Sequence, residues 1–535
     1  MSTSDAGGRT PSASPPGRAI VSRLIATFSG TVGLGVKILL LAVMNAVAVW
    51  AAAILAGDGK WIALGALIAS TAAIDAVYLF SRRVIPLKFL VPGTLLLLAF
   101  QVTPIVYTVD VAFTNYSTGH LATKPEAIRA ITQNTLEPPP GGKSYVMAPA
   151  RDAGGALVLI LRDEETGKAF AGTRKGLEPL APGAVREQAG AIVAADGYTL
   201  ITGSELFTLD REIRSLLVPT EGSAAIRAEG LSTAIELQPT LRYDARANTF
   251  TRISNSLVFR DNRHGSFIAA NGEELEPGWR TGVGFENFGR MLHDPLIRKP
   301  FLRVLTWTFA FAFLAVGLAF ALGLFLAITL DKPGMRFQRF YRSLLIIPYA
   351  IPGFLSLLVW SGLLNDDFGV VNRLFHTSIP WLFDPWWAKA SIILVSLWLT
   401  FPYFFLVCLG ALQSIPAELT EAARVDGGGR LQIFRRVTLP LLMVAVAPLL
   451  IASFAFNFNN FNNIYFLTAG GPAATDQSVA GSTDILISYT YKIAFQAGKG
   501  QDYGLATSMA IAIFFIVGTI SAVSFSRTKA LENLQ

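Results

Sequence analysis

Residues 304–330 read VLTWTFAFAFLAVGLAFALGLFLAITL, a run that contains no charged side chain. A helix of about 20 apolar residues is long enough to cross the hydrocarbon core of a bilayer, so this run predicts a transmembrane helix. Seven further apolar stretches lie at residues 35–56, 61–80, 89–112, 342–364, 388–412, 441–466 and 503–525. We therefore predict an all-α polytopic membrane protein with eight transmembrane helices.

The composition supports this class. The chain has 535 residues, of which 52% are hydrophobic and only 15% charged, whereas a soluble globular protein carries roughly 25% charge. This shortage excludes a disordered chain, a fibrous protein and an ordinary cytosolic enzyme.

Cofactor and metal chemistry have little support in the residues. The single cysteine, Cys408, lies in an apolar stretch and excludes a disulfide framework. The four histidines are far apart and show no HExxH spacing. Gly142-Lys143-Ser144 resembles the end of a phosphate-binding loop, but Glu137 stands where its first glycine would be. We predict no catalytic residue, no metal site and no ATPase motif in this chain.

Lysine and arginine residues predict the orientation, because they concentrate in cytoplasmic loops. With eight spans, every basic segment falls on one side: the tail 1–34, the loops after spans two, four and six, and the tail 527–535. Both termini are therefore predicted to be cytoplasmic. Helices one to three occupy 35–113, and helices four to eight occupy 301–526.

The insertion at residues 114–300 is predicted to be periplasmic. Between residues 115 and 299 it carries 21 basic and 22 acidic side chains, so the net charge of +7 belongs to the membrane part and indicates topology. Alternating runs at 156–162 and 168–172 predict strands. Asp196-Gly197 predicts a hairpin between 191–195 and 198–202, and 208–217 is expected to be helical. We predict a β-rich domain.

Residues 414–440 read SIPAELTEAARVDGGGRLQIFRRVTLP and connect spans six and seven. Residues 417–425 form a good helical run, the triple glycine 427–429 predicts a chain reversal, and a second helix is expected from Arg430. The segment is therefore a helix–turn–helix elbow. Local chemistry alone leaves a docking elbow and an ordinary basic loop about equally supported.

The spacing in this loop resembles the EAA loop of permease subunits of ABC importers. The matching residues are Glu421, Ala422, Ala423, Gly427, Leu439 and Pro440. Val437 departs from the pattern, which usually has isoleucine there. The resemblance implies that the loop docks on a partner ATPase subunit, with Glu421 and Gly427 transmitting its motion.

Span seven contains SFAFNFNNFNN at residues 453–463. Ser453, Phe456, Asn457 and Asn460 fall at i, i+3, i+4 and i+7 and therefore share one helical face. Asparagine is costly in hydrocarbon, so this face should meet protein or water. Amides and an aromatic ring suit an uncharged, polyhydroxylated solute, although hydrogen bonds between helices remain an equal alternative.

Residues 448–461, 468–472 and 489–495, together with the eight spans and the insertion after the third, resemble the larger permease subunit of maltose/maltodextrin ABC importers. This resemblance implies the type I importer fold and a substrate site at Leu399, Tyr403, Ser453, Phe456, Asn457 and Asn460. Thr400 stands where that subunit has glycine, and Asn462 and Asn463 replace apolar residues, so the sugar stays open.

The resemblance further implies an inner-membrane complex. Its partners would be a second permease subunit, two ATPase subunits that bind ATP and Mg²⁺, and a periplasmic sugar-binding protein. An importer for trehalose or another oligosaccharide is the main alternative. Three other classes are less well supported. A membrane receptor would need a cytoplasmic output domain, and a membrane glycosyltransferase would need paired carboxylates at a membrane edge. A secondary transporter would need internal repeats.

A few membrane residues carry weaker expectations. Asp75 in span two is more consistent with a structural role, although intramembrane carboxylates are often functional. Pro348 and Pro352 in span five and Pro402 in span six are expected to kink helices around a pathway.

Overall fold

The computed structural model describes residues 30–80, 85–220, 224–332, 334–474, 478–496 and 501–532. The chain divides into two compact units, residues 1–107 and 108–535, and each is described by itself. Most of the predicted N-terminal tail, and Arg82 and Arg83 after span two, lie outside the described residues.

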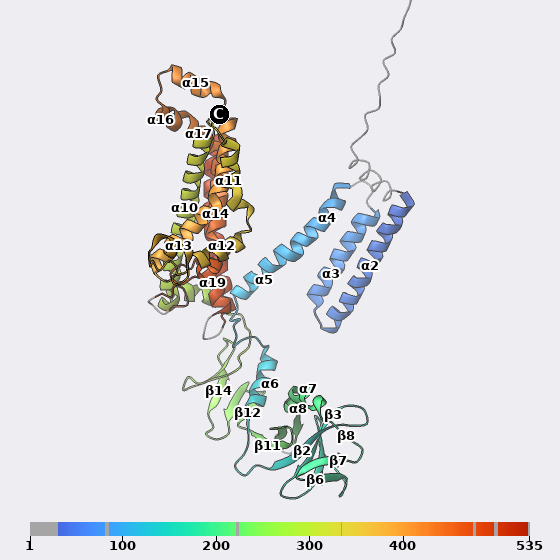
Figure 1. The fold of residues 1–535 in the computed structure, drawn as a ribbon. Helices are drawn as coiled ribbons and strands as arrows, with labels where there is room; N and C mark the ends of the chain where they lie inside the picture. The colour runs from blue at the N-terminus through green and yellow to red at the C-terminus, as the bar shows by residue number, and fades with distance from the viewer. Residues whose placement is uncertain are drawn as a thin grey trace, which may run out of the picture. The chain divides into compact units, whose positions relative to one another are not determined.

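The first unit is helical. Its elements are α2 (Gly30–Gly57), α3 (Trp61–Asp75), the π-helical turn η1 (Ala76–Phe80), α4 (Ile85–Leu97), η2 (Leu98–Val102) and the first turn of α5 (Thr103–Ala112). Helices α2 and α3 lie side by side (Figure 1), and the Asn45 amide donates to the Asp75 carboxylate at 3.1 Å. Asp75 therefore makes a hydrogen bond between helices, as its structural interpretation requires.

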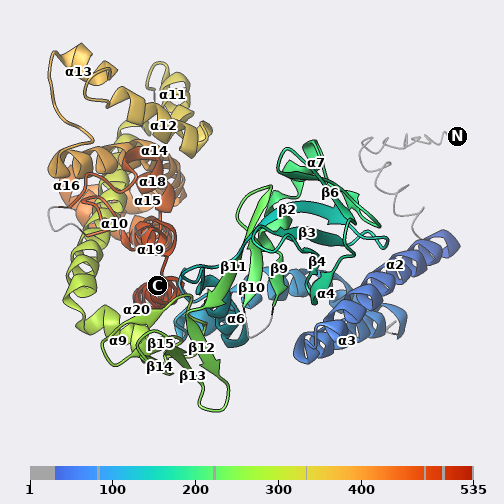
Figure 2. The same cartoon turned by 90° about the horizontal axis from the view of Figure 1, so that it is seen from below.

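The inserted domain, residues 114–300, contains three antiparallel sheets, so the prediction of a β-rich insertion is confirmed. A nine-stranded sheet has the path β5-β4-β3-β2-β11-β10-β9, with β1 beside β11 and β8 beside β2, and Figure 2 shows its central strands side by side. These strands are β1 (Leu136–Glu137), β2 (Ser144–Arg151), β3 (Leu157–Asp163), β4 (Ala169–Thr173), β5 (Gly176–Pro179), β8 (Thr199–Leu200), β9 (Leu217–Pro219), β10 (Ala225–Ala228) and β11 (Thr233–Pro239).

The two smaller sheets complete the domain. One has β12 (Leu241–Asp244), β13 (Thr249–Arg252), β14 (Val258–Asp261), β15 (Phe267–Ala269) and β16 (Glu274–Leu275), and the other pairs β6 (Val185–Gln188) with β7 (Ala191–Ala195). Helix α6 (Lys124–Asn134) packs on the five-stranded sheet through buried Ala127 and Ile131.

Two local predictions in this domain are confirmed only in part. The turn at Asp196-Gly197 forms, but only one bridge, between Ala195 and Tyr198, continues it, because β7 pairs with β6 and β8 with β2. The helix predicted at 208–217 is split into α7 (Ser204–Thr208) and α8 (Asp210–Ser215), since Leu217 already pairs with β10. In both cases tertiary pairing overrides the local pattern.

The helical part of the second unit begins with α9 (Glu286–His293) and α10 (Pro295–Leu330). It continues with α11 (Gln338–Ala350), α12 (Gly353–Leu363), α13 (Val370–Phe375), α14 (Pro385–Ser414), α15 (Ala417–Val425), α16 (Arg430–Ile433), η4 (Phe434–Thr438), α17 (Leu439–Phe458), α18 (Phe461–Thr468), α19 (Leu486–Phe495) and α20 (Tyr503–Glu532). Over the whole described chain, seven helices are long and apolar enough to span a membrane, and the count is eight if the bent pair α11–α12 is taken as one span.

Two predicted spans are not continuous helices. The span at 342–364 bends by 92° between α11 and α12, where Pro352 lacks an N–H and Ile351 before it is extended. The span at 441–466 ends at Phe458, and α18 begins after the Asn460 cap, whose side chain accepts from the Asn463 N–H at 3.2 Å. Asparagine competes for backbone hydrogen bonds in this way and so favours caps over helix interiors.

Close packing of α10 against α14 forms the centre of the helical unit. A Cβ added to Gly323 of α10 would lie 2.7 Å from the backbone nitrogen of Phe405 in α14. Glycine is therefore required for this approach. Cys408 is fully buried in the same cluster, with Leu324 and Ala327, and behaves as the small hydrophobe that the sequence predicts.

The inserted domain is joined to the helices by polar contacts. The Asn287 amide of α9 donates to the carbonyls of Ala112 and Thr114, at 3.0 and 2.8 Å. Arg290 pairs with Asp502, directly before α20, at 2.9 Å. The domain therefore meets the helices at one end, whereas α15 and α16 lie at the other (Figure 1).

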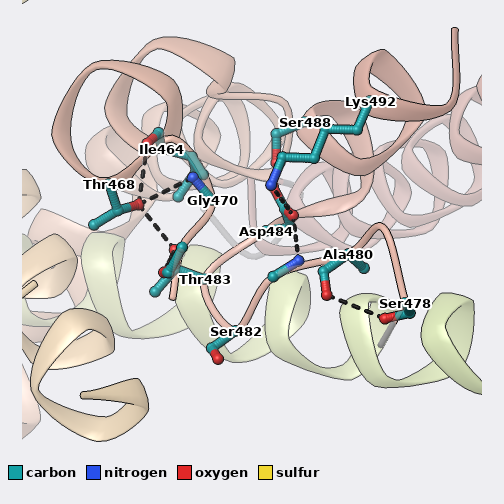
Figure 3. A network of polar contacts seen from close by, with 12 residues as sticks. Ile464, Thr468, Gly470, Ser478, Ala480, Ser482, Thr483, Asp484, Ser488 and Lys492 are labelled. Carbon is teal, nitrogen blue, oxygen red and sulfur yellow. Dashed lines mark hydrogen bonds and ion pairs between the residues drawn. The ribbon is translucent and has the colours of Figure 1, made fainter. Parts of the chain in front are cut away.

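A buried ion pair organises the segment between α18 and α19 (Figure 3). The Asp484 carboxylate, whose side chain is fully buried, lies 2.7 Å from Lys492 Nζ. It also accepts from the Gly481 N–H at 2.7 Å and from the Ser488 hydroxyl at 2.8 Å. Burial raises the pKa of Asp484, so the ammonium and these two donors must offset the cost of burying the charge.

The same segment holds the end of α18. The Thr468 and Thr483 hydroxyl oxygens lie 2.8 Å apart, and the Trp307 indole of α10 donates to the Thr483 carbonyl at 3.2 Å. Gly470 has a φ of +78°, and a Cβ there would overlap the Asp484 carboxylate. The ion pair therefore fixes the loop that anchors α18 to α10.

We expect Lys492→Met to destabilise the protein, because the Asp484 charge would stay buried without its counter-ion, at a cost on the order of 3–5 kcal/mol. A lower Tm of the purified complex would measure this loss. The double variant Asp484→Leu/Lys492→Met should recover most of it, since both charges are then gone. An unchanged Tm in the single variant would contradict the structural role of the pair.

Candidate functional site

One cavity of about 680 Å³ lies within the helical unit. It is bounded by the breaks in two spans, α11–α12 and α17–α18, and by α14, where Leu399 and Tyr403 lie near the middle of the helix. None of its described lining residues is charged. Its wall combines aromatic rings with amides and hydroxyls, so it suits a neutral solute with polar groups and apolar faces.

The six residues predicted to bind substrate all line this cavity: Leu399, Tyr403, Ser453, Phe456, Asn457 and Asn460. They come from α14, α17 and the cap of α18, so the fold brings together positions up to about 60 residues apart along the chain. Their contact with a solute stays a prediction.

The four residues predicted on span seven, Ser453, Phe456, Asn457 and Asn460, do not all lie on one helix face, because α17 ends at Phe458. Asn457 is 3% exposed, and its amide donates to the Ser453 carbonyl at 2.9 Å. Phe456, one residue earlier, is 69% exposed. Asn460 lies beyond the end of α17 and caps α18. Near the break, the Asn457 and Asn460 side chains therefore make hydrogen bonds to protein, whereas the Phe456 ring faces the open cavity.

Several lining residues were not predicted from the sequence. They are Pro348, Tyr349, Ile351, Gly353, Phe354 and Leu357 around the α11–α12 break, Thr400 on α14, Ala452 on α17, and Asn462 and Asn463 on α18. The signal for the first group is the pair Pro348 and Pro352, which was expected to kink span five around a pathway. The 92° bend at Pro352, beside the cavity, confirms the kink expected there, whereas Pro348 lies inside α11 and Pro402 inside α14.

Asn463 links the cavity wall to α14. Its amide donates to the Ser396 hydroxyl at 2.9 Å, and both side chains are buried. This bond is the kind that the alternative interpretation of the asparagine cluster expects. Hydrogen bonding between helices and a solute-facing surface therefore occur together, on different residues of one segment.

The loop between spans six and seven has the predicted elbow form. Helix α15 covers Ala417–Val425, and Gly427 follows it with a φ of +84°, a value that glycine adopts without strain. The Gly427 and Gly428 N–H groups donate to the Arg424 and Ala423 carbonyls at 3.1 and 3.0 Å. These bonds close the helix end and turn the chain into α16.

The predicted coupling residues lie along this elbow. Glu421, Ala422 and Gly427 are exposed, Ala423 is half-buried, and Leu439 and Pro440 begin α17. Val425 and Leu431 are 87% and 69% exposed. The elbow thus presents apolar side chains and a carboxylate beyond the helices, and its role in coupling stays a prediction.

No metal centre is evident in the described ranges, where no three histidine, cysteine, aspartate or glutamate side chains come together.

Comparison with known proteins identifies the family. Residues 319–532 match "Binding-protein-dependent transport system inner membrane component", and residues 95–175 match "N-terminal of TM subunit in PBP-dependent ABC transporters". The chain is 36% identical over 473 residues to the maltose/maltodextrin transport system permease protein MalF of Klebsiella aerogenes, covering 85% of this chain and 89% of that protein. The chain belongs to the MalF family of permeases.

A second relative agrees. MalF of Escherichia coli K12 is 35% identical over 488 residues, covering 87% of this chain and 91% of that protein. Among solved structures, a bacterial ABC transporter that imports the acidic polysaccharide alginate is similar, with 21% identity, a TM-score of 0.41, and coverage of 46% of this chain and 84% of that one. As a MalF-family permease, the chain is a multi-pass inner-membrane transport component with an inserted β-rich domain.

Proposed function

We propose that this permease translocates maltose or maltodextrins through the cavity between α11–α12, α14 and α17–α18. The observation that carries the proposal is the character of the cavity wall. It has amides and hydroxyls, exposed aromatic surface at Phe456 and no described charge. The hydroxyls of a sugar can bond the amides and hydroxyls of the wall, and its apolar CH faces can pack on the Phe456 ring. The names of the relatives support the same substrate.

The other subunits of the importer follow from the family. A second permease subunit would pair with this one and close the cavity, and two ATPase subunits would bind ATP and Mg²⁺. The exposed elbow of α15 and α16, with Val425 and Leu431, offers them an apolar docking surface. A periplasmic sugar-binding protein would dock on the inserted domain, at the end of the helices opposite to the elbow.

We further infer the orientation. Arg424, Arg430, Arg435 and Arg436 belong to the connection between α14 and α17 that contains the elbow. Basic side chains concentrate on the cytoplasmic side of a membrane. The elbow would therefore be cytoplasmic and the inserted domain periplasmic, with both termini in the cytoplasm.

Alternating access would use these parts in sequence. Closure of the ATPase subunits would move the elbow, and η4 continues directly into α17, whose far end carries Ser453, Phe456 and Asn457. A movement at the elbow therefore reaches the cavity through one continuous stretch of helix. Hydrolysis by the partner subunits would reset the helices, and this chain would perform no covalent chemistry.

Uptake of radiolabelled maltose, by cells in which this chain is the only large permease subunit, tests the substrate. We expect uptake in the wild type and a loss of about tenfold in Phe456→Ala, because the exposed ring is the apolar platform for the sugar. Phe515→Ala is the matched control, since Phe515 on α20 is 65% exposed but does not line the cavity. Uptake of trehalose in place of maltose would overturn the assignment to maltose.

Coupling is tested at the glycines of the elbow. Gly427→Val forces a β-branched residue into left-handed backbone, at a cost of about 1–2 kcal/mol, so we expect uptake to fall roughly 5- to 30-fold. Gly429→Ala is the control, because Gly429 has a φ of −69° and open space around its Cβ position.

Glu421→Lys should likewise reduce uptake, because it reverses a charge on the exposed docking face. The measurement compares sugar uptake with ATP hydrolysis by the reconstituted complex. Uncoupling lowers transport per ATP, whereas full uptake in both Gly427→Val and Glu421→Lys would refute the coupling role.

A further inference from the structure

The cavity wall contains polar groups that the protein leaves unused. Of its asparagines, Asn457 and Asn463 are buried and donate to Ser453 and Ser396, and the Asn460 carbonyl oxygen accepts from the Asn463 N–H. Asn462 differs, because its side chain is exposed and makes no hydrogen bond to any described residue. The amide of Asn462 is therefore available to a solute.

Thr400 is a second polar residue of the cavity wall. It lies on α14 between Leu399 and Tyr403, and it lines the same cavity. Other threonines of the long helices bond a carbonyl four residues earlier, as Thr306 does with Leu302 at 2.9 Å and Thr308 with Val304 at 2.7 Å. The Thr400 hydroxyl makes no hydrogen bond within the described chain, although it lies in a helix where such a bond is within reach.

We propose that Thr400 and Asn462 bind sugar hydroxyl groups and determine which hydroxyl pattern this permease accepts. This inference rests on the proposed function and goes beyond the six residues that the family resemblance implies. A polar group facing an otherwise apolar part of a cavity is satisfied only by water or by a ligand that offers a partner. A sugar that lacks the matching hydroxyl would displace that water without replacing its hydrogen bond.

The two residues come from two helices that border the cavity. Thr400 contributes one hydroxyl from α14, and Asn462 contributes a donor and an acceptor from α18, which the Asp484–Lys492 segment holds in place. Asn463 fixes α18 to α14 through Ser396, so the separation between the two walls is set by protein contacts. Two polar groups held at a fixed separation discriminate between hydroxyl positions, because a misplaced hydroxyl cannot move the wall toward it.

A double-mutant cycle between protein and sugar tests the proposal. The assembled transporter, with its ATPase subunits and binding protein, is reconstituted with Thr400→Val or Asn462→Leu, which delete the polar groups at similar volume. Initial uptake is measured for maltose and for each monodeoxy maltose. The variant-to-wild-type ratio for each sugar cancels the selectivity of the binding protein, which is the same in both measurements.

We expect each variant to lose roughly threefold to tenfold in maltose uptake, the factor for one neutral hydrogen bond. For one monodeoxy maltose the variant should lose nothing further relative to the wild type, because the missing hydroxyl is the partner of the deleted group. A purely structural role would instead lower uptake of all the sugars by the same factor. Asn459→Leu is the matched control, since Asn459 is exposed at the same break but does not line the cavity.

The outcomes separate the two claims. If maltose is transported by the wild type but both variants behave like Asn459→Leu, or lose all sugars equally, this inference is overturned and the proposed function stands. If the wild type transports a different disaccharide, the same cycle with the monodeoxy forms of that sugar decides the inference. A wild-type complex that transports no sugar overturns the proposed function and the inference together.

Discussion

Backbone amide and carbonyl groups cannot be left unpaired in hydrocarbon, and this constraint determines where the helices of the permease can be interrupted. A break in a spanning helix is tolerated only where protein or a water-filled cavity can satisfy the freed groups. Both breaks in the described helical unit, at Ile351-Pro352 and at Asn459-Asn460, border the same cavity. The two spans are therefore interrupted at the place where the cavity lies, because only there can the freed backbone groups be satisfied.

The asparagine-rich segment satisfies this constraint in two ways. Asn460 caps α18 and Asn463 bonds Ser396, so these side chains stabilise the break itself. Their protein contacts allow the neighbouring Asn462 to stay unpaired at the cavity surface. Without Asn460 and Asn463 in these roles, Asn462 would be needed to satisfy the freed backbone groups and could not face a solute.

The sequence was sufficient to predict the parts that depend on local composition. Apolar length predicted the spans, and the run 417–425 followed by three glycines predicted α15 and its reversal because glycine and helix propensity act locally. The six expected site residues were identified through the family resemblance, and the fold does bring them together. What failed depends on contacts distant in sequence. Periodicity cannot show that Asn460 leaves the helix to cap another, or that the strand after Asp196-Gly197 pairs with β2.

Close packing and buried polar contacts connect the helices that border the cavity, although two of its walls are broken helices. Gly323 brings α10 within van der Waals contact of the α14 backbone, so α14 is fixed against α10. Trp307 and Thr308 on α10 then bond Thr483 and Leu486, in the segment that Asp484 and Lys492 hold together. Thr468 at the end of α18 bonds the same Thr483. The α14 wall and the α18 wall of the cavity are thus both fixed relative to one helix, α10. Because close-packed interfaces are bistable and resist continuous deformation, such a frame favours movement of whole helices over gradual widening of the cavity.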